Sequence, residues 1–368
     1  MAHGHEWYME LALAEARKGL GRTSPNPAVG AVVVKDGKVV GRGYHHRAGT
    51  PHAEVHALAD AGPQARGATI YVTLEPCNHT GRTPPCTEAI LAAGIAMVVI
   101  GMADPNPRVA GGGAAYLRQR GLEVVSGVLE QPCRALNYPF IKHSTTGLPW
   151  VMMKAGLSLD GKITFRSRQG AALTGEESWR FVHRLRNQTD AILIGVETAI
   201  IDDPSLTTRL EGVADTRDPV RVVLDSCLRL PPQARMLHQR STAETWVVCG
   251  SEASSDREEQ LVRAGARVLR LVLGADGRVD LPAMLRLLGA RNLTSVLVEG
   301  GAGIHGAMYG QRLVDELLLF YAPFIVGDQG TPLVSGYSLA RRDQAPRLAD
   351  VALQPLGNDF LFRALVRP

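Results

Sequence analysis

The stretches PHAEVHAL (residues 51–58) and TLEPCNHTGRTPPC (residues 73–86) decide how the first half of this chain folds. The first begins the run HAEVHALADAG, which predicts a helix, and the second completes the β-branched run ATIYVTL, which predicts a buried strand. Its final cysteine opens CTEAILAAG, a second predicted helix, and IAMVVIGM follows as another predicted strand. Apolar strands that alternate with helices are typical of a sheet covered on both faces.

Four side chains of these stretches predict a zinc site. His52, Cys77 and Cys86 provide one imidazole and two thiolates, which is a complete protein donor set for a catalytic zinc ion that keeps its fourth position for water. Glu54 follows His52 by two residues, so the first helical turn can direct both side chains to one small volume. The order His-x-Glu and then Pro-Cys is typical of zinc-dependent deaminases, although eight residues separate the two cysteines here instead of two.

The alternative is a zinc ion that only stabilises the fold. Such a site usually has a fourth protein ligand, and His79, His56 and His45 are available for that role. The insert between the two cysteines is expected beside the metal in either case, and Arg82 is its one fixed charge.

The composition predicts a globular protein of two domains. The chain has 368 residues, more than one hydrophobic core usually contains, and 45% of them are hydrophobic while 21% are charged. No apolar run approaches the roughly 18 residues of a membrane span, and the N-terminus lacks the pattern of a secretory signal. We therefore expect a cytoplasmic protein without a membrane partner. The odd number of widely spaced cysteines argues against a disulfide framework.

The charge distribution argues against a nucleic-acid partner. The formal net charge is +4, and the 40 lysine and arginine residues form no basic run. A small anionic substrate is compatible with this mild positive charge.

Periodicity divides the chain into two α/β halves. In the first, a helix is expected to end at Gly19, and Asp36-Gly37 between two β-branched runs predicts a hairpin, because glycine accepts the positive φ of a tight turn. HSTTGLPW (residues 143–150) has small and turn-forming residues and is the best linker candidate. After it, strands are predicted in WVMMKAG, AILIG, VRVVLD, TWVVCG, RVLRLVL, SVLVEGG and ELLLFYAPFIVG, and helices at 176–187, 256–265 and 281–290.

A glycine-rich turn in the second half is a candidate phosphate site. LVEGGAGIHGAMY (residues 297–309) is predicted to be a strand that ends in an acid and enters a helix through glycines, where backbone N–H groups can bind a pyrophosphate. The turn does not match G-x-G-x-x-G, so by itself it does not identify a nucleotide site.

Longer motifs resemble one known family. TSPNPAVGAVVV, HAEVHAL, TLEPCNHTGRTPPC and DPNPRVAGGG resemble the deaminase half of the bifunctional riboflavin-biosynthesis deaminase/reductase family over residues 5–145, and the eight-residue insert is similar to that family's own variant. MMKAGLSLDGKI, TDAILIGVETAIIDDPSLTTR, RVVLDSCLR and LVEGGAGIHGAMY resemble its reductase half over residues 148–366. The resemblance implies an α/β chain in which residues 1–146 form a cytidine-deaminase-like three-layer α/β/α domain and residues 147–368 form a dihydrofolate-reductase-like α/β domain.

The resemblance also implies two successive reactions. The first is hydrolytic deamination of 2,5-diamino-6-(5-phosphoribosylamino)pyrimidin-4(3H)-one, with one Zn²⁺ per chain and Glu54 as the general acid/base. The second is reduction of the ribosyl group to ribityl, with NADPH as the hydride donor. A homo-oligomer, dimeric or larger, is implied as well.

Within the deaminase half, three residues are candidates for substrate contact. Asn26 belongs to the rigid PNP loop, where its amide can bind the pyrimidine edge or simply form a turn. His45 and Arg82 are candidates for the ribose phosphate.

Matching positions in the reductase half imply three groups of residues. The NADPH contacts are Gly156, Thr198, Asp202, Ser226, Gly301, Ala302, Gly303, Ile304, His305, Gly306 and Ala307. The substrate contacts are Arg186, Leu206, Arg209 and Glu299. Lys154 and Asp160 are the catalytic candidates, with Lys154 as a substrate or proton-transfer partner. The structural alternatives are a helix-end cation for Arg186, a turn for Asp202 and a solvated side chain for Arg209.

One stretch departs from the family. A Ser-x-Trp-Ile-Thr stretch usually supplies a hydroxyl to the substrate and an indole to the cofactor, but GAALT occupies residues 170–174 here. Gly170 and Ala172 have no side chain that could make these contacts, so the roles are not carried over. Trp179 is the aromatic candidate to compensate.

Two other functions stay open on the sequence. A salvage or RNA-directed deaminase fused to a reductase would share the zinc site, but it would need a basic or aromatic nucleic-acid surface. A non-enzymatic, zinc-stabilised nucleotide sensor would have no use for a free Glu54 carboxylate beside an open zinc position. The motifs favour the two-step riboflavin enzyme.

Overall fold

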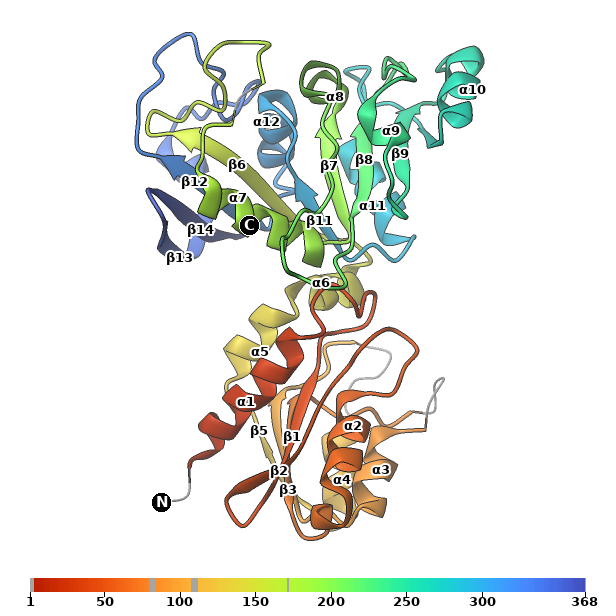
Figure 1. Ribbon diagram of the computed structural model, residues 1–368, viewed down its shortest axis with the longest axis vertical. Coiled ribbons are helices and arrows are strands. Elements are labelled where there is room, and N and C mark those ends of the chain that lie inside the picture. The colour runs from red at the N-terminus through yellow and green to blue at the C-terminus, as the bar shows by residue number, and fades with distance from the viewer. Residues whose placement is uncertain (1–2, 80–83, 107–111, 171, 368) are drawn as a thin grey trace. The chain divides into compact units, whose positions relative to one another are not determined.

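The computed structural model describes residues 3–79, 84–106, 112–170 and 172–367, which divide into two compact units, Met1–Gly147 and Leu148–Pro368 (Figure 1). The stretch expected to be a linker is largely regular structure, because residues 143–146 end a helix and Trp150 begins a strand. Gly147 has a φ of 74°, which suits glycine after a helix end. Within the described ranges, no helix is long and apolar enough to cross a membrane.

The N-terminal unit is built on a five-stranded sheet with the order β2-β1-β3-β4-β5. β1 is antiparallel to β2 and β3, whereas β3, β4 and β5 run parallel. The strands are β1 (Gly30–Lys35), β2 (Lys38–Tyr44), β3 (Thr69–Leu74), β4 (Met97–Met102) and β5 (Glu123–Ser126). The helices are α1 (His5–Arg17), α2 (Ala53–Ala61), the 3₁₀ helix η1 (Gly62–Ala65), α3 (Cys86–Ala92), α4 (Gly113–Gln119), α5 (Glu130–Leu136) and α6 (Tyr138–Thr146).

The predicted hairpin and the three layers are confirmed. Asp36 and Gly37 join β1 to β2 with φ values of 48° and 74°, the left-handed pair that a two-residue hairpin turn needs. Glycines on the strands let helices approach both faces of the sheet (Figure 1). A Cβ atom at Gly30 would lie 2.1 Å from a backbone oxygen of α1, and one at Gly43 would lie 2.4 Å from a backbone oxygen of α2. α1 and α5 therefore cover one face, and α2, α3 and α4 cover the other.

The C-terminal unit is built on a nine-stranded sheet with the order β10-β9-β8-β7-β11-β6-β12-β14-β13. Neighbours from β10 to β12 are parallel, and β14 is antiparallel to both β12 and β13. The strands are β6 (Trp150–Ser158), β7 (Ala191–Gly195), β8 (Val220–Leu224), β9 (Thr245–Gly250), β10 (Ala266–Leu271), β11 (Ser295–Val298), β12 (Glu316–Ala322), β13 (Arg347–Leu356) and β14 (Asp359–Arg367). The helices are α7 (Glu176–Gln188), α8 (Val196–Asp202), α9 (Arg235–His238), α10 (Ser255–Arg263), α11 (Leu281–Gly289), α12 (Ala302–Gly310) and the 3₁₀ helix η2 (Arg342–Gln344).

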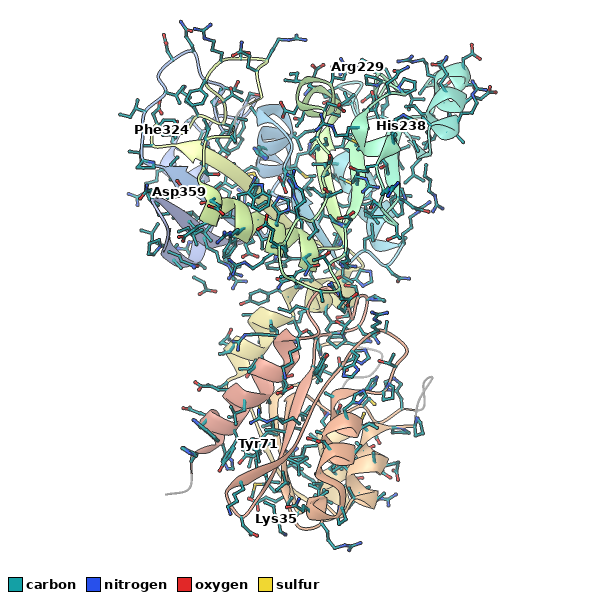
Figure 2. The ribbon with its side chains drawn as sticks, in the orientation of Figure 1. Lys35, Tyr71, Arg229, His238, Phe324 and Asp359 are labelled. Carbon is teal, nitrogen blue, oxygen red and sulfur yellow. The ribbon has the colours of Figure 1, made fainter. Side chains whose placement is uncertain are left out.

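Alternate side chains of this sheet enter different cores, as expected of an α/β unit. Leu193 on β7 packs in the core that includes residues of α11 and α12, whereas its neighbours Ile192 and Ile194 pack in the core that includes α8, α9 and α10. α7 covers that second face near β14, and Asp359 at the start of β14 fixes the helix in place (Figure 2). The Asp359 carboxylate accepts hydrogen bonds from the Gly175 N–H (2.7 Å) and the Ser178 hydroxyl (2.6 Å). The sheet is thus covered on both faces.

Separating the chain between Gly147 and Leu148 is expected to give two proteins that each unfold cooperatively, because each unit has its own sheet and its own buried core. Urea or thermal unfolding followed by circular dichroism checks this. The matched control is a cut after Ser241, which separates β8 from its neighbour β9 and should leave no folded C-terminal piece. A fragment of residues 1–147 or 148–368 without a cooperative transition would contradict the boundary.

Candidate active sites

The three zinc-ligand candidates meet where β3, α2 and α3 come together. His52 is the residue before α2, and Cys86 is the first residue of α3. His52 Nδ1 lies 3.2 Å from Cys86 Sγ and 3.5 Å from Cys77 Sγ, and the backbone N–H of Cys86 donates to Cys77 Sγ (3.3 Å). One donor atom from each residue lies within 4.8 Å of the others. One histidine and two cysteine side chains thus surround a space that matches a single metal ion.

The protonation of this group is linked to metal binding, because a metal ion binds the neutral imidazole and the thiolates. A hydrogen bond from Cys86 lowers the pKa of Cys77 to about 4, and His52 contributes to the decrease. The same contact, together with burial, raises the pKa of Cys86. The hydrogen bond to Cys77 raises the pKa of His52. The sulfur pair therefore holds negative charge next to the imidazole, which a divalent cation would stabilise further.

The residues present fit a three-ligand zinc site. One imidazole and two thiolates are the set found in catalytic sites that keep an open position. Among the residues that the structure describes, no fourth histidine, cysteine, aspartate or glutamate joins the group. Of the alternatives for a fourth ligand, His56 stacks on His46 with ring centroids 4.2 Å apart, and His45 makes the contacts given below. This arrangement argues against a zinc ion that serves the fold alone.

Glu54 lies in the first turn of α2 and is only 3% exposed. Burial raises its pKa, while the nearby His52 works in the opposite direction. A buried carboxyl with a raised pKa takes up a proton more readily than a solvated one, which suits a general acid/base. Glu54 is not part of the three-residue donor group, although its carboxyl contacts the Cys86 thiol, so it lies beside the metal donors without being one of them.

His45 occupies a different place from the one expected of a phosphate ligand. It is 2% exposed, its Nε2 lies 3.3 Å from the Asn26 amide nitrogen, and its Nδ1 lies 3.2 Å from the Pro51 carbonyl oxygen. Both ring nitrogens are thus engaged within the protein, and burial lowers the pKa of His45, which disfavours the cation that would bind phosphate. This geometry favours a role in orienting Asn26, whose side-chain amide donates to the ring, and the phosphate contact of His45 stays a prediction. Arg82, the other phosphate candidate, lies outside the described residues.

The sequence reasoning overlooked Glu75 near this site. Its carboxylate accepts hydrogen bonds from the backbone N–H groups of Ala114 (2.8 Å) and Asp104 (3.3 Å), so it ties the end of β3 to the chain after β4. An acidic residue directly after a parallel strand was the available signal, because ligands of open α/β sheets bind at the carboxyl ends of strands.

In the C-terminal unit, Glu299 is the centre of a buried ion cluster. β11 and β6 are parallel with Val298 beside Met153, so the next residues, Glu299 and Lys154, are neighbours. Arg186 donates to both Glu299 oxygens at 2.9 Å, and Lys154 Nζ lies 3.4 Å from one of them. Burial alone would raise the pKa of Glu299, but the two cations outweigh it and hold the pKa below its usual value. Three predicted site residues thus form one charged group.

Replacing Glu299 by Ala is expected to destabilise the C-terminal unit by about 3–5 kcal/mol, because it leaves Arg186 and Lys154 buried without their carboxylate. Urea unfolding followed by tryptophan fluorescence measures the loss. The matched control is Glu197→Ala, which breaks an exposed pair with Arg229 and should cost less than about 1 kcal/mol. Equal, small effects of the two substitutions would contradict a buried ion cluster.

The glycine-rich turn leads into α12 beside α8. The backbone N–H of Gly301 donates to the Thr198 hydroxyl (3.1 Å), and Gly301, the N-cap residue of α12, has no side chain that could cap the helix. An uncapped helix start presents N–H groups that bind anions such as a pyrophosphate, so this turn fits NADPH. The residues of the turn with exposed surface are Gly301, Gly303, Ile304 and Ala307.

Two side-chain positions of the same turn serve packing instead. A Cβ atom at Gly306 would lie 2.0 Å from the Ser335 carbonyl oxygen, so glycine is needed there for close approach of the chain. His305 is 2% exposed, and its Nδ1 lies 3.2 Å from the Leu333 carbonyl oxygen. The side-chain positions of His305 and Gly306 therefore face the protein, and the cofactor contacts expected of these two residues stay predictions. Ala302 is buried too, and its carbonyl accepts the Ser335 N–H (2.9 Å).

The remaining cofactor candidates lie at or just past the carboxyl ends of elements. Gly156 is near the end of β6, Ser226 follows β8, and Asp202 ends α8. The Ser226 hydroxyl accepts the Val279 N–H (3.2 Å), and burial raises the pKa of Asp202.

A Cβ atom at Gly170 would lie 2.1 Å from Asp202 Oδ1. Glycine therefore suits residue 170, where the family usually has serine, because a serine side chain there would have to displace the Asp202 carboxylate.

Asp160 anchors a loop through its carboxylate. Its carboxylate accepts hydrogen bonds from the Ser158 hydroxyl (2.6 Å) and from the backbone N–H groups of Val326 (3.0 Å) and Gly327 (2.8 Å). These bonds hold the pKa of Asp160 below its usual value, and the bond from Ser158 has the largest effect. Both oxygens thus hold the chain after β12 against the end of β6, and the catalytic role of Asp160 stays a prediction that these contacts disfavour.

The other substrate candidates belong to one segment after α8. Leu206 is 4% exposed with a φ of 53°, and Arg209 is exposed, with its guanidinium 5.5 Å from the ring centroid of Trp179. His183, which the sequence reasoning overlooked, accepts a hydrogen bond from the Arg209 N–H (2.9 Å). The signal for it was the spacing of Trp179, His183 and Arg186, which places all three on one face of a helix.

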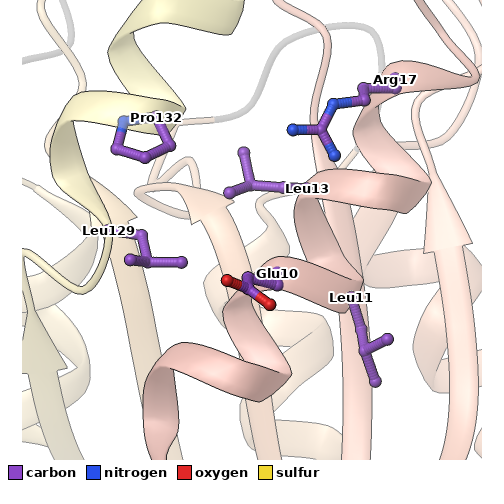
Figure 3. Close-up of a pocket in the computed structure, with 6 residues that line it drawn as sticks. All are labelled: Glu10, Leu11, Leu13, Arg17, Leu129 and Pro132. Atoms are coloured by element: carbon purple, nitrogen blue, oxygen red, sulfur yellow. The ribbon is translucent and has the colours of Figure 1, made fainter.

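A hollow of about 460 Å³ between α1 and α5 is separate from these sites (Figure 3). It is lined by Glu10, Leu11, Leu13, Arg17, Leu129 and Pro132. α1 and α5 cover the sheet face opposite the one covered by α2 and α3, which carry the zinc-site residues. None of the predicted site residues contributes to the lining of this hollow.

Two family models match the chain. Residues 2–102 match the cytidine and deoxycytidylate deaminase zinc-binding region, and residues 149–362 match the RibD C-terminal domain. The riboflavin biosynthesis protein RibD of Escherichia coli K12 is 41% identical over 364 residues, which cover 96% of this chain and 97% of that protein. That of Aquifex aeolicus is 42% identical and covers 87% of each chain.

Solved structures show the same similarity. Acinetobacter baumannii RibD (form 1) has a TM-score of 0.88 and 35% identity, and the match covers 99% of both chains. A diaminohydroxyphosphoribosylaminopyrimidine deaminase/5-amino-6-(5-phosphoribosylamino)uracil reductase from Thermotoga maritima has a TM-score of 0.85 and 37% identity, with 98% of each chain covered. The likeness thus extends over both units.

Proposed function

Since the chain belongs to the RibD family of riboflavin-biosynthesis proteins, we propose that its N-terminal unit deaminates 2,5-diamino-6-(5-phosphoribosylamino)pyrimidin-4(3H)-one and that its C-terminal unit then reduces the ribosyl group to ribityl. The chain is a bifunctional deaminase and reductase that uses zinc and NADPH. The observation that carries the proposal is the buried Glu54 carboxyl beside the His52, Cys77 and Cys86 donors, in one chain with the Glu299 cluster.

The deamination step assigns separate tasks to the residues of the first site. His52, Cys77 and Cys86 hold the zinc ion, which when bound activates a water molecule as the nucleophile. Glu54 takes a proton from the attacking water and delivers it to the ring nitrogen and then to the departing amine. The C–N bond breaks, oxygen from water replaces nitrogen on the ring, and ammonia leaves. Asn26, oriented by His45, is the candidate for binding the pyrimidine edge.

The reduction step uses the charged cluster of the second unit. The opened ribosylamine is an imine, which is reduced when hydride adds to C1′ and a proton adds to nitrogen, and NADPH supplies that hydride when bound. The turn from Gly301 into α12 binds the pyrophosphate of the cofactor. Lys154 is the candidate proton or hydrogen-bond donor to the reacting sugar, and its Nζ is held 3.4 Å from Glu299. Arg186 fixes Glu299 and the neighbouring loop.

The test is to incubate the pure protein with the diaminopyrimidine substrate and NADPH. We expect ammonia to appear first and NADPH absorbance to fall after it, and we expect the deaminated compound to be reduced without ammonia release. Release of ammonia without oxidation of NADPH would contradict the second activity. Deamination of a nucleoside or a tRNA in preference to the phosphoribosylated pyrimidine would favour the salvage or RNA-directed alternative.

Two further features belong to this proposal. The homo-oligomer implied by the family resemblance stays a prediction, which analytical ultracentrifugation would test. The cytoplasmic location also stays a prediction, and fractionation of cells that express the protein would test it. The sensor alternative is disfavoured, because a sensor has no use for a free buried carboxyl beside three metal donors.

A further inference from the structure

Helix α7 presents three side chains to the segment of residues 203–209. Trp179, His183 and Arg186 are spaced four and three residues apart, so they lie on one face of the helix. Asp359 holds the start of this helix through Gly175 and Ser178, which fixes where the three side chains lie. The face is therefore a rigid support rather than a mobile surface.

The supported segment has a conformation that needs external contacts. Asp203 and Leu206 have φ values of 38° and 53°, in the left-handed region that residues other than glycine seldom adopt. Such conformations persist where surrounding contacts over-determine them. Side chains from outside the segment bind its backbone at four places. Two of them donate to carbonyl oxygens, Gln239 to that of Ser205 (2.7 Å) and Arg186 to that of Thr207 (3.0 Å). Two others accept backbone N–H groups, Asp218 that of Thr208 (2.7 Å) and His183 that of Arg209 (2.9 Å).

His183 acts at the residue that carries the exposed charge. Its Nδ1 accepts the Arg209 N–H, so the proton of the neutral ring is on Nε2. The Trp179 ring packs against His183 with centroids 4.1 Å apart and planes tilted by 52°, and the Arg209 guanidinium lies 5.5 Å from the Trp179 centroid. Both the backbone and the side chain of Arg209 thus contact this pair of rings.

The environment of His183 keeps it an acceptor. The residue is 1% exposed, and burial, helped by the positive charges of Arg186 and Arg209, lowers its pKa to about 4. A protonated ring would have no lone pair on Nδ1 to accept the Arg209 N–H. The hydrogen bond is therefore present throughout the neutral range.

We propose that His183 is a positioning residue for the reductase reaction, which fixes the backbone of Arg209 and, through Trp179, directs its guanidinium toward the phosphate of the phosphoribosyl substrate. This inference rests on the proposed function, because it takes Arg209 as a phosphate ligand. It also gives Trp179 a role on the substrate side, in place of compensation for the missing indole at Ala172.

The test compares His183→Asn with His183→Gln. Asparagine places an amide oxygen near the position of Nδ1 and should keep the bond to Arg209, whereas the longer glutamine side chain places its amide near Nε2. With the deaminated substrate and NADPH, we expect glutamine to raise KM for the substrate about tenfold, from the cost of an unpaired backbone donor, with kcat changed less than about twofold. Asparagine should leave KM within about twofold of the wild-type value.

The action through Arg209 is tested by combining substitutions. In an Arg209→Ala background, His183→Gln should change KM by less than about twofold, because there is no guanidinium left to position. Trp179→Leu, at a partly exposed ring, gives a second measurement and should show the same loss of effect in that background. Equal KM values for the asparagine and glutamine variants would overturn the inference, as would a tenfold effect that persists without Arg209.

The outcomes separate this inference from the proposed function. An Arg209→Ala variant with unchanged KM would remove Arg209 from the substrate site, and the inference with it. A wild-type protein that does not oxidise NADPH with the deaminated compound would contradict the proposed reductase activity itself. Normal activity with a raised KM in Arg209→Ala and no effect of His183→Gln would overturn the inference alone.

Discussion

Glu54→Gln is expected to keep its zinc ion and to lose ammonia release by at least about 10²–10⁴-fold. The substitution preserves shape and hydrogen-bonding capacity, but an amide cannot take a proton from water and pass it to the substrate. Because Glu54 lies outside the three-residue donor group, metal affinity should not depend on it. The measurements are zinc content by atomic spectroscopy and ammonia release from the diaminopyrimidine substrate.

Two controls make this result specific. Glu88→Gln changes an exposed carboxylate two residues after Cys86 and should leave deamination unchanged. The Glu54→Gln variant itself should reduce the deaminated compound at the wild-type rate, since the C-terminal unit carries that reaction. Full ammonia release by Glu54→Gln would remove the residue from the mechanism, and loss of zinc would show that the carboxyl is a ligand.

Cys86→Ser is expected to weaken zinc binding at least about 100-fold and to abolish deamination. Outer contacts of metal ligands are worth 10–100-fold in affinity, and removal of a ligand should cost more. Cys77 and Cys86 form one hydrogen-bonded pair in which the contact lowers the pKa of one thiol and raises that of the other. Loss of either sulfur therefore removes one zinc ligand and also the hydrogen-bond partner that shifts the pKa of the other thiol. Cys77→Ser should for this reason have the same effect as Cys86→Ser.

The zinc-to-protein ratio after dialysis against a weak chelator measures this effect. His52→Ala tests the third donor, and Cys227→Ser is the matched control because that thiol is exposed and belongs to the other unit. A ratio that stays at the wild-type value in any one of the three ligand variants would contradict the assignment of that ligand. The reductase rate should stay unchanged in all of them.

Local sequence was sufficient for the elements whose signals are local. The turn at Asp36-Gly37 needed only residues that tolerate positive φ, and the apolar strands of both units needed only their own composition. The β13–β14 hairpin was not predicted, because β13 is exposed along nearly its whole length and has no alternating pattern. Its position depends on pairing with β14, which is information outside the strand itself.

In the candidate sites, too, features with local signals could be predicted, and features that depend on distant residues could not. The donors His52, Cys77 and Cys86 could be selected from spacing because metal chemistry requires particular residue types in a particular order. The hydrogen-bond partners of Asp160 and His45 could not be predicted in this way. The partners that occupy Asp160 include Val326 and Gly327, more than 160 residues away in the sequence, and only the fold brings them together.

The order of strands in the C-terminal sheet has a consequence for biosynthesis of the chain on the ribosome. β14 lies between β12 and β13, and among the described strands it is the one that pairs with β13. Residues 347–356 therefore have no place in the sheet until residues 359–367 have emerged. All strands of the first unit lie within residues 30–126, so that unit can mature during translation, while the second must wait for nearly its last residue.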